Sequence, residues 1–317
     1  MSLKEAKEKF KALFASVDKK NKVKFIDFVY EQLVSCNNLG EPYEDEDSEK
    51  HEGLLDDPIS TLNNIAEEIK KKVPVSAILS SEKISPPKTG QNADCLSDIT
   101  VHVDEFLYDD DDIEDLAEDG KLKRNYCMDC GSKNIEPLIF ISHSMSRKSV
   151  YYVFNDCLPT LENKIVLDVG SRLGVVLYGA YVLTDASQII GVEMNEDLCK
   201  LQREIIEKYK MQDRIEVMCK KIEESDDVVK SADVIVINNA FEFYVTDEKQ
   251  VEIWQFLKSN IKSKCILVTR PHLETTFENL DTGINLKTWV KPYRLNGEEI
   301  ATSNEEEFCD LNFYEIL

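Results

Sequence analysis

The stretch VLDVGSRLGVV, residues 166–176, decides the fold. It opens with an apolar run around Asp168, the pattern of a buried strand. Gly170 permits a tight turn, and Gly174 lies where the next helix is expected to begin. Ligands of open α/β sheets bind at the carboxyl ends of the strands, so this loop predicts a ligand site that faces the N–H groups of the helix.

Strands and helices alternate on the carboxyl side of this stretch. The strands are continuous runs of Val, Ile and Leu, which is typical of a parallel sheet covered by helices on both faces. The pattern predicts strands over residues 164–169, 188–194, 214–219, 232–238 and 265–270, helices over 175–183, 197–209 and 249–261, and an added antiparallel strand over 285–295.

The second predicted strand ends in an acid, Glu193. A carboxylate at this place accepts hydrogen bonds from ribose hydroxyls, which nicotinamide cofactors and S-adenosylmethionine both carry. The dinucleotide fingerprint G-x-G-x-x-G requires a glycine where this chain has Arg172. The sequence therefore favours S-adenosylmethionine over a nicotinamide cofactor.

These motifs and the strand–helix order resemble the class I S-adenosylmethionine-dependent methyltransferases over about residues 160–295. The resemblance implies an α/β fold with a Rossmann-like seven-stranded sheet and S-adenosyl-L-methionine as the cofactor. It implies that the first motif lines the methionine and ribose part of the cofactor, that Glu193 binds the ribose, and that Met194 and the loop after the third strand contact the adenine. The cofactor-binding residues implied in this way are Asp168, Gly170, Ser171, Gly174, Glu193, Met194, Cys219 and Lys220.

The fourth predicted strand ends in Asn238-Asn239-Ala240-Phe241, where amino-directed members of this class carry N-P-P-aromatic. The resemblance implies that Asn238, Asn239 and Phe241 are catalytic. An Asn carbonyl oxygen can accept a hydrogen bond from the target N–H, and an aromatic ring attracts a cation such as the sulfonium group. The two prolines are missing here, so the rigid backbone geometry of the motif is not implied, and an Asn that caps a strand-end turn is the alternative.

A weaker, local resemblance links the chain to the disruptor-of-telomeric-silencing family of histone-lysine methyltransferases. It rests on the segments DVGSRLG, GVE and NNAF.

Three regions are expected along the chain. Residues 1–95 predict a helical accessory region, with helices over 3–37 and 59–73, Ser60 as an N-cap, and a linker over 80–94. Residues 96–150 combine an acidic segment, a short helix over 113–119 and a short strand over 138–141. Residues 151–317 form the methyltransferase domain.

The chain is strongly acidic: 38 Lys and Arg against 61 Asp and Glu give a net charge of −23. Residues 41–57 hold nine acids, and residues 104–119 hold ten. These segments either are solvated loops or attract a basic protein or peptide substrate electrostatically. The charge argues against direct nucleic-acid binding, and no apolar run is long enough to cross a membrane.

The nine cysteines are widely spaced, and the N-terminus has no apolar signal segment. Both features predict an intracellular protein, cytoplasmic or nuclear, with reduced thiols. Cys127 and Cys130 have the spacing of half a zinc knuckle, which His102, His143 or Cys157 could complete; a tight turn with two thiols is the alternative.

Two histidines are further candidates. His143 precedes the cofactor domain and is either a base or a hydrogen-bonded loop residue. His272 follows the fifth predicted strand and is expected at the carboxyl edge of the sheet.

The sequence thus predicts an S-adenosylmethionine-dependent methyltransferase, directed at an amine or amide nitrogen of a protein or peptide. The alternative is a cofactor-binding pseudoenzyme or adaptor that binds a partner through its acidic N-terminal half. A nicotinamide-dependent dehydrogenase is a third reading.

Overall fold

The computed structural model describes residues 9, 13, 57–87, 99–127, 135–293 and 308–317. The chain divides into two compact units, residues 1–54 and 55–317. Only Lys9 and Leu13 of the first unit are described, and both are helical. The rest of the helices predicted over 3–37, and the acidic stretch 41–56, lie outside the described residues.

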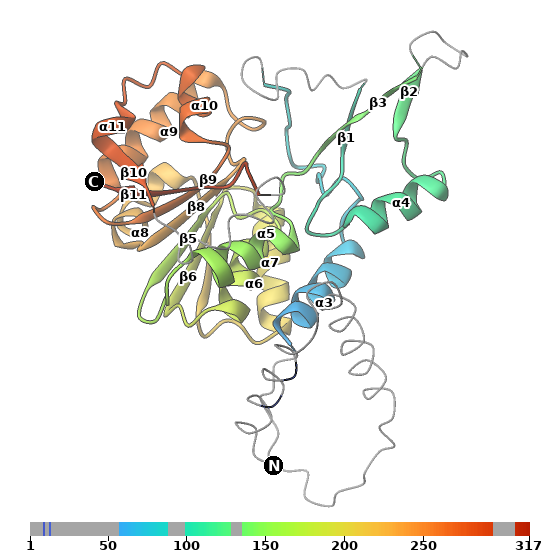
Figure 1. Ribbon diagram of the computed structural model, residues 1–317, viewed down its shortest axis with the longest axis horizontal. Coiled ribbons are helices and arrows are strands. Elements are labelled where there is room, and N and C mark those ends of the chain that lie inside the picture. Colours follow the sequence, from blue (N-terminus) through green and yellow to red (C-terminus); the bar gives the residue numbers. More distant parts are fainter. Residues whose placement is uncertain (1–8, 10–12, 14–56, 88–98, 128–134, 294–307) are drawn as a thin grey trace, which may run out of the picture. The chain divides into compact units, whose positions relative to one another are not determined.

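A seven-stranded sheet forms the centre of residues 55–317 (Figure 1). Its order is β10-β11-β9-β8-β5-β6-β7, and β11 alone runs antiparallel to its neighbours. The strands are β5 (Ile165–Val169), β6 (Gln188–Glu193), β7 (Ile215–Cys219), β8 (Val234–Asn238), β9 (Ile266–Arg270), β10 (Val290–Pro292) and β11 (Asn312–Ile316). A mixed sheet with one antiparallel strand is the sheet of the class I methyltransferases, so the predicted fold class is confirmed.

The apolar strands bury both of their faces because successive side chains point to opposite sides of the sheet. Val166 and Val234 belong to one buried cluster, with the side chains of α6 and α7. Leu167 and Ile235 belong to a second cluster, with those of α8 and α9. The helices are α6 (Val175–Leu183), α7 (Glu196–Lys208), α8 (Asp226–Ser231) and α9 (Asp247–Asn260).

The first described helix, α3 (Pro58–Lys70), packs on α6 and belongs to the same core as the sheet. Its N-cap is Asp57 rather than the predicted Ser60, because the Asp57 carboxylate accepts a hydrogen bond from the Ser60 N–H at 3.4 Å. Pro58 then occupies the first helical position, where its missing N–H costs nothing.

The acidic segment 104–119 is folded where a solvated loop was one expectation. Helix α4 (Asp110–Glu118) begins with a capping box in which Asp109 and Asp112 each accept the backbone N–H of the other. Asp104 is buried, and its carboxylate accepts a hydrogen bond from Ser144 at 2.6 Å. Some of the acidic residues therefore cap a helix or accept a buried hydrogen bond, and are not simply solvated charges.

Two small sheets flank α4. Strands β1 (Thr100–His102) and β4 (Ile139–Ile141) pair in parallel, and β2 (Asn125–Cys127) pairs with β3 (Ile135–Pro137) antiparallel. Helix α5 (Arg147–Tyr151) and a π-helical turn (Tyr152–Cys157) lead into β5.

The prediction for residues 285–295 is wrong in part. Residues 286–289 form a short helix, α11 (Leu286–Trp289), and the following strand β10 is antiparallel to β11 but parallel in direction to the core strands. The antiparallel strand is β11, at the C-terminal end of the printed sequence. Helix α10 (Leu273–Glu278) lies between β9 and α11. Within the described residues, no helix has the length and apolar character needed to span a bilayer.

We expect Gly179→Ala to destabilise the fold. A Cβ at Gly179 in α6 would clash with Cγ1 of Val150 in α5. In a helix interior, alanine raises the free energy of unfolding by about 1 kcal/mol relative to glycine. An overpacked core lowers it by about 1–3 kcal/mol. Because the contact with Val150 is so close, we expect a loss near the upper end of that range. Urea denaturation should therefore show a net loss of stability.

The double variant Val150→Ala/Gly179→Ala removes the contact and supplies the control. It should be at least as stable as Val150→Ala alone. A gain in stability from Gly179→Ala in the native background would contradict the α5–α6 packing.

Candidate active site

A cavity of about 590 Å³ lies at the carboxyl ends of β5, β6, β7 and β8. Its size is that of a small-molecule site. It is lined by Ser81, Glu82, Lys83, Val169, Gly170, Arg172, Val192, Glu193, Met194, Asn195, Leu198, Lys220, Lys221, Ile222, Glu223, Ala240, Phe241, Tyr244, Val245, Lys249 and Ile253. Of the residues predicted for the site, Gly170, Glu193, Met194, Lys220 and Phe241 line the cavity.

Gly170 forms the turn at the floor of the cavity. Its φ of +75° is left-handed, and its N–H donates to the carbonyl oxygen of Val192 at 2.9 Å. A Cβ on Gly170 would lie 3.2 Å from Cβ of Ala240, in the loop after β8. The absence of a side chain therefore lets the loops after β5 and β8 approach each other beside the ligand space.

Ser171 and Gly174 shape the turn without lining the cavity. The buried Ser171 hydroxyl donates to Oε1 of Gln202 at 2.8 Å. Gly174 has a φ of +84°, and a Cβ there would lie 2.7 Å from the hydroxyl of Tyr178. In this structure both residues support the packing of α6 against α7.

Glu193 presents its carboxylate to the cavity in a fixed orientation. Oε2 accepts the N–H of Arg172 at 3.0 Å, and Oε1 accepts the N–H of Asn195 at 2.7 Å. Each carboxylate oxygen keeps a second lone pair, so the group can still accept hydrogen bonds from a diol. Burial raises the pKa of Glu193, although both N–H donors oppose that shift.

Asp168 does not line the cavity. It directly precedes Val169, which does, and it is 3% exposed. Burial, followed by the nearby Glu193 carboxylate, raises the pKa of Asp168 to about 8. Near neutral pH the Asp168 carboxyl is therefore largely protonated, and it places no second full negative charge beside Glu193.

Of the three predicted adenine contacts, Met194 and Lys220 line the cavity and Cys219 does not. Met194 lies on the rim with 58% of its surface exposed, and the Lys220 N–H donates to the Glu193 carbonyl oxygen at 3.0 Å. Cys219 is exposed and does not line the cavity. Ile222 supplies an apolar wall in the same loop.

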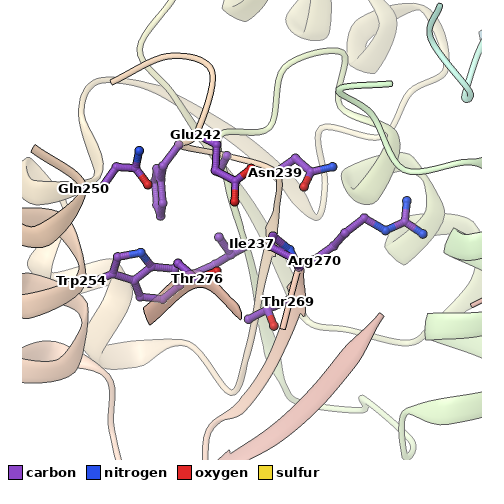
Figure 2. Close-up of a pocket in the computed structure, with 11 residues that line it drawn as sticks. Ile237, Asn239, Glu242, Gln250, Trp254, Thr269, Arg270 and Thr276 are labelled. Carbon is purple, nitrogen blue, oxygen red and sulfur yellow. The ribbon is translucent and has the colours of Figure 1, made fainter. Parts of the chain in front are cut away.

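The motif after β8 separates the large cavity from a smaller one of about 20 Å³ (Figure 2). Phe241 lines both, and its ring meets the ring of Trp254 edge-on with centroids 5.6 Å apart. Asn239 lines only the smaller cavity; its φ is +47°, and its N–H donates to the Arg270 carbonyl oxygen at 2.8 Å. Figure 2 shows Asn239 and Arg270 extending to one side of this cavity and Trp254 and Gln250 entering from the other.

Asn238 ends β8, and its side-chain oxygen is buried. Within the described part of the chain this oxygen has no hydrogen-bond partner. A buried acceptor without a donor is costly, so the Asn238 oxygen is available to a donor from outside the described residues.

Several cavity residues escaped the sequence analysis. Glu82 and Lys83 lie about 90 residues before the first motif, and Tyr244 and Lys249 follow the fourth. Arg172 was recognised only as the residue that breaks a dinucleotide fingerprint. No local pattern marks Glu82, because its partner Arg172 is distant in sequence.

His143 is a buried residue of a histidine pair. Its Nε2 lies 3.0 Å from Nδ1 of His102, and the two rings stack. Burial, and then the charge of Arg172, lowers the pKa of His143 to about 3, so it stays neutral. His272 is exposed and precedes α10.

The proposed half-knuckle cannot be placed. Cys127 ends β2, but its side chain and all of Cys130 lie outside the described residues. No group of three or more His, Cys, Asp or Glu side chains arranged to hold a metal occurs among the described residues. Zinc at Cys127 and Cys130 stays a prediction.

No protein-family model matches the chain. Its sequence is similar to the rRNA N(6)-adenosine-methyltransferase METTL5 of Danio rerio, with 26% identity over 134 residues, which is 42% of this chain and 63% of that protein. The matching part therefore spans less than two thirds of the relative's length.

Solved methyltransferase structures give fold-level matches. The RNA methyltransferase from Salinibacter ruber in complex with S-adenosyl-L-homocysteine has a TM-score of 0.36 and 15% identity, covering 55% of this chain and 92% of that one. The precorrin-6y C5,15-methyltransferase from Geobacter metallireducens has a TM-score of 0.38 and 14% identity, covering 48% and 77%. The strand order of the sheet, rather than these scores, carries the assignment of the fold.

The raised pKa of Asp168 predicts a pH dependence of stability. The unfolded pKa is about 3.9 and the folded value is about 8. Since the folded state binds more protons between these values, stability falls as pH rises from about 4 to 8 and is level above. Asp168→Asn removes this loss, so its melting temperature relative to the native chain should climb over that interval.

Asp226→Asn is the control measured in the same thermal scans. The hydrogen bond from the Lys230 side chain lowers the pKa of Asp226. Asp226→Asn should therefore lose stability relative to the native chain only as pH rises toward about 4, and between about 4 and 8 its difference from the native chain should stay constant. A pH-independent difference for Asp168→Asn would show that the Asp168 carboxyl is ionised throughout.

Proposed function

We propose that this chain, which has the class I methyltransferase fold, is an S-adenosylmethionine-dependent methyltransferase that acts on a nitrogen atom. The cavity at the strand ends is the cofactor site. The observation that carries the proposal is the Glu193 carboxylate, oriented by two backbone N–H groups on the wall of a cavity whose floor is the Gly170 turn.

The residues present fit the cofactor. Gly170 lines the cavity, and because it has no side chain a ligand can approach its backbone closely. Glu193 can accept hydrogen bonds from the ribose diol, while Val192, Leu198 and Ile222 supply apolar surface for a base. When bound, S-adenosylmethionine would supply a methyl group on a positively charged sulfur: the acceptor nitrogen would form a bond to the methyl carbon as the carbon–sulfur bond breaks, with S-adenosyl-L-homocysteine as the neutral leaving group.

The residues of the chain contribute by positioning and by exclusion of water. The buried side-chain oxygen of Asn238 has no donor among the residues that the structure describes, which suits an N–H of the acceptor. Phe241 stands between the cofactor cavity and the smaller cavity and is held by Trp254. Few ionising groups are needed for such a displacement, because the acceptor has only to lose a proton.

Two nitrogen acceptors follow from different observations. The acidic composition favours an amine of a basic protein or peptide, as the sequence analysis expects. The similarity to an rRNA adenosine methyltransferase adds an adenine of RNA, contrary to the expectation of no direct nucleic-acid contact. The motif after β8 is compatible with either nitrogen, so the acceptor is decided by experiment.

Calorimetric titration with S-adenosyl-L-homocysteine tests the cofactor site. The native chain should bind, and Glu193→Ala should lose about tenfold or more in affinity, because a hydrogen bond to a charged group contributes about 1.5–3 kcal/mol. Glu196→Ala is the matched control: this acid lies three residues away, is largely exposed and forms an ion pair with Lys200 at 3.3 Å. Equal loss in both variants, or no binding by the folded native chain, would overturn the proposal.

Transfer of a labelled methyl group separates an enzyme from an adaptor. We expect transfer to an unmodified RNA or to a basic peptide, and Asn238→Ala should abolish it while the affinity for S-adenosyl-L-homocysteine stays within about threefold, since Asn238 does not line the cofactor cavity. Phe241→Leu, which keeps an apolar side chain against Trp254, should reduce transfer less than Asn238→Ala.

The adaptor alternative makes the opposite prediction. It expects cofactor binding without transfer to either acceptor, together with partner capture that depends on the acidic N-terminal half. A salt-independent interaction with the acceptor would remove the argument from charge.

A further inference from the structure

One wall of the cofactor cavity comes from a segment far from the sheet in sequence. Residues 79–85, called the strap below, cross the carboxyl edge of the sheet and touch three of its loops. Ser81 hydrogen-bonds Asn195 after β6, with 3.1 Å between Oγ and Nδ2. The Ser85 N–H donates to the Phe243 carbonyl oxygen after β8 at 3.0 Å. The sequence analysis expected a linker over 80–94; the described part, residues 80–87, is structured against the domain.

The third contact joins the strap to the loop after β5 through a buried ion pair. Nη2 of Arg172 lies 2.9 Å from Oε1 of Glu82, and it also donates to the Ala77 carbonyl oxygen at 2.9 Å. The side chains of Arg172 and Glu82 are 8% and 4% exposed. Among the described residues, the only other acid within ion-pair distance of Arg172 is Asp104, with 3.9 Å between Nη1 and Oδ2.

The backbone of Arg172 is held in an unfavourable conformation. Its φ is +41°, in the left-handed region that suits glycine, and Ala77 opposite has a φ of +50°. Such conformations persist only where the surroundings over-determine them. For Arg172 these surroundings are the Glu82 carboxylate at the side chain, the Gln202 amide at the carbonyl oxygen (2.7 Å) and the Glu193 carboxylate at the N–H (3.0 Å).

These contacts make a continuous path from the strap to the ribose-binding acid. Glu82 fixes the guanidinium group, the guanidinium group fixes the loop, and the N–H of the same residue orients Glu193. Without Glu82, the buried charge of Arg172 loses its close partner. If the guanidinium group then moves toward water, the loop after β5 that carries Arg172 must shift as well.

We infer that Glu82 is a positioning residue for the cofactor: through Arg172 it couples the position of the strap to the orientation of Glu193. This inference rests on the proposed function. Arg172 thus has a role that a glycine at the same position would lack. A glycine has no side chain to pair with Glu82, so the turn would be independent of the strap.

Four chains test the coupling: the native protein, Glu82→Gln, Arg172→Gly and the double variant. Calorimetry with S-adenosyl-L-homocysteine and thermal melting are measured on each. Glu82→Gln should weaken binding about tenfold to a hundredfold, the range of typical coupling between sites. In the Arg172→Gly background the same change should have no effect on affinity or should improve it, because the guanidinium group that Glu82 holds is gone and the Glu82 carboxylate is itself left buried without its partner.

The double variant keeps the test valid if Glu82→Gln folds poorly, since it removes both charges of the buried pair and glycine adopts the required backbone conformation without strain. Glu196→Gln, with the same change of charge on an exposed acid, should leave the affinity unchanged. Equal affinity of Glu82→Gln and the native chain, or equal losses from Glu82→Gln in both backgrounds, would overturn the inference. Failure of the native chain itself to bind would instead overturn the proposed function.

Discussion

The guanidinium group of Arg172 lies buried between the Glu82 carboxylate and the Ala77 carbonyl oxygen, while the N–H of the same residue binds Glu193. A charge in this position is tolerated only with a close counter-charge. The pair therefore ties a segment before the sheet to the first loop of the sheet, and it sets the backbone from which Glu193 is oriented. The cavity wall, the turn and the acid thus depend on one buried contact.

The parallel core was readable from sequence because its strands are continuous apolar runs. Buried on both faces, β5 and β8 need no polar alternation, and the predicted ranges agree with the observed ones to within two residues. The edge of the sheet was harder. β11 carries Asn312 and Glu315 among aromatic residues and pairs antiparallel with β9, far from it in sequence. Such a strand has neither a continuous apolar run nor an adjacent helix to mark it.

The sequence predicts those site residues whose place follows from the strand or turn in which they stand. Gly170 and Glu193 stand at the ends of recognisable strands, so their place at the cavity follows from strand order. Ser171 and Gly174 belong to the same motif, yet their contacts with Gln202 and Tyr178 are made across the packing of α6 and α7. Glu82 was beyond reach, because an ion pair formed across 90 residues leaves no periodic signal.

The loop after β8 shows why the missing prolines matter. Proline fixes φ near −65°, whereas Asn239 has a φ of +47°, a conformation that Asn tolerates better than most residues. The observed turn is thus one that an N-P-P-aromatic tetrapeptide could not form. Its N–H is also used, since it donates to the Arg270 carbonyl oxygen, and proline has no such donor. The chain thus has the Asn and the aromatic of that tetrapeptide on a backbone that proline could not adopt. Asn238, at the start of this loop, has a buried side-chain oxygen with no hydrogen-bond partner among the described residues, so under the proposed function this side chain, rather than a backbone fixed by proline, is what the loop offers to the acceptor.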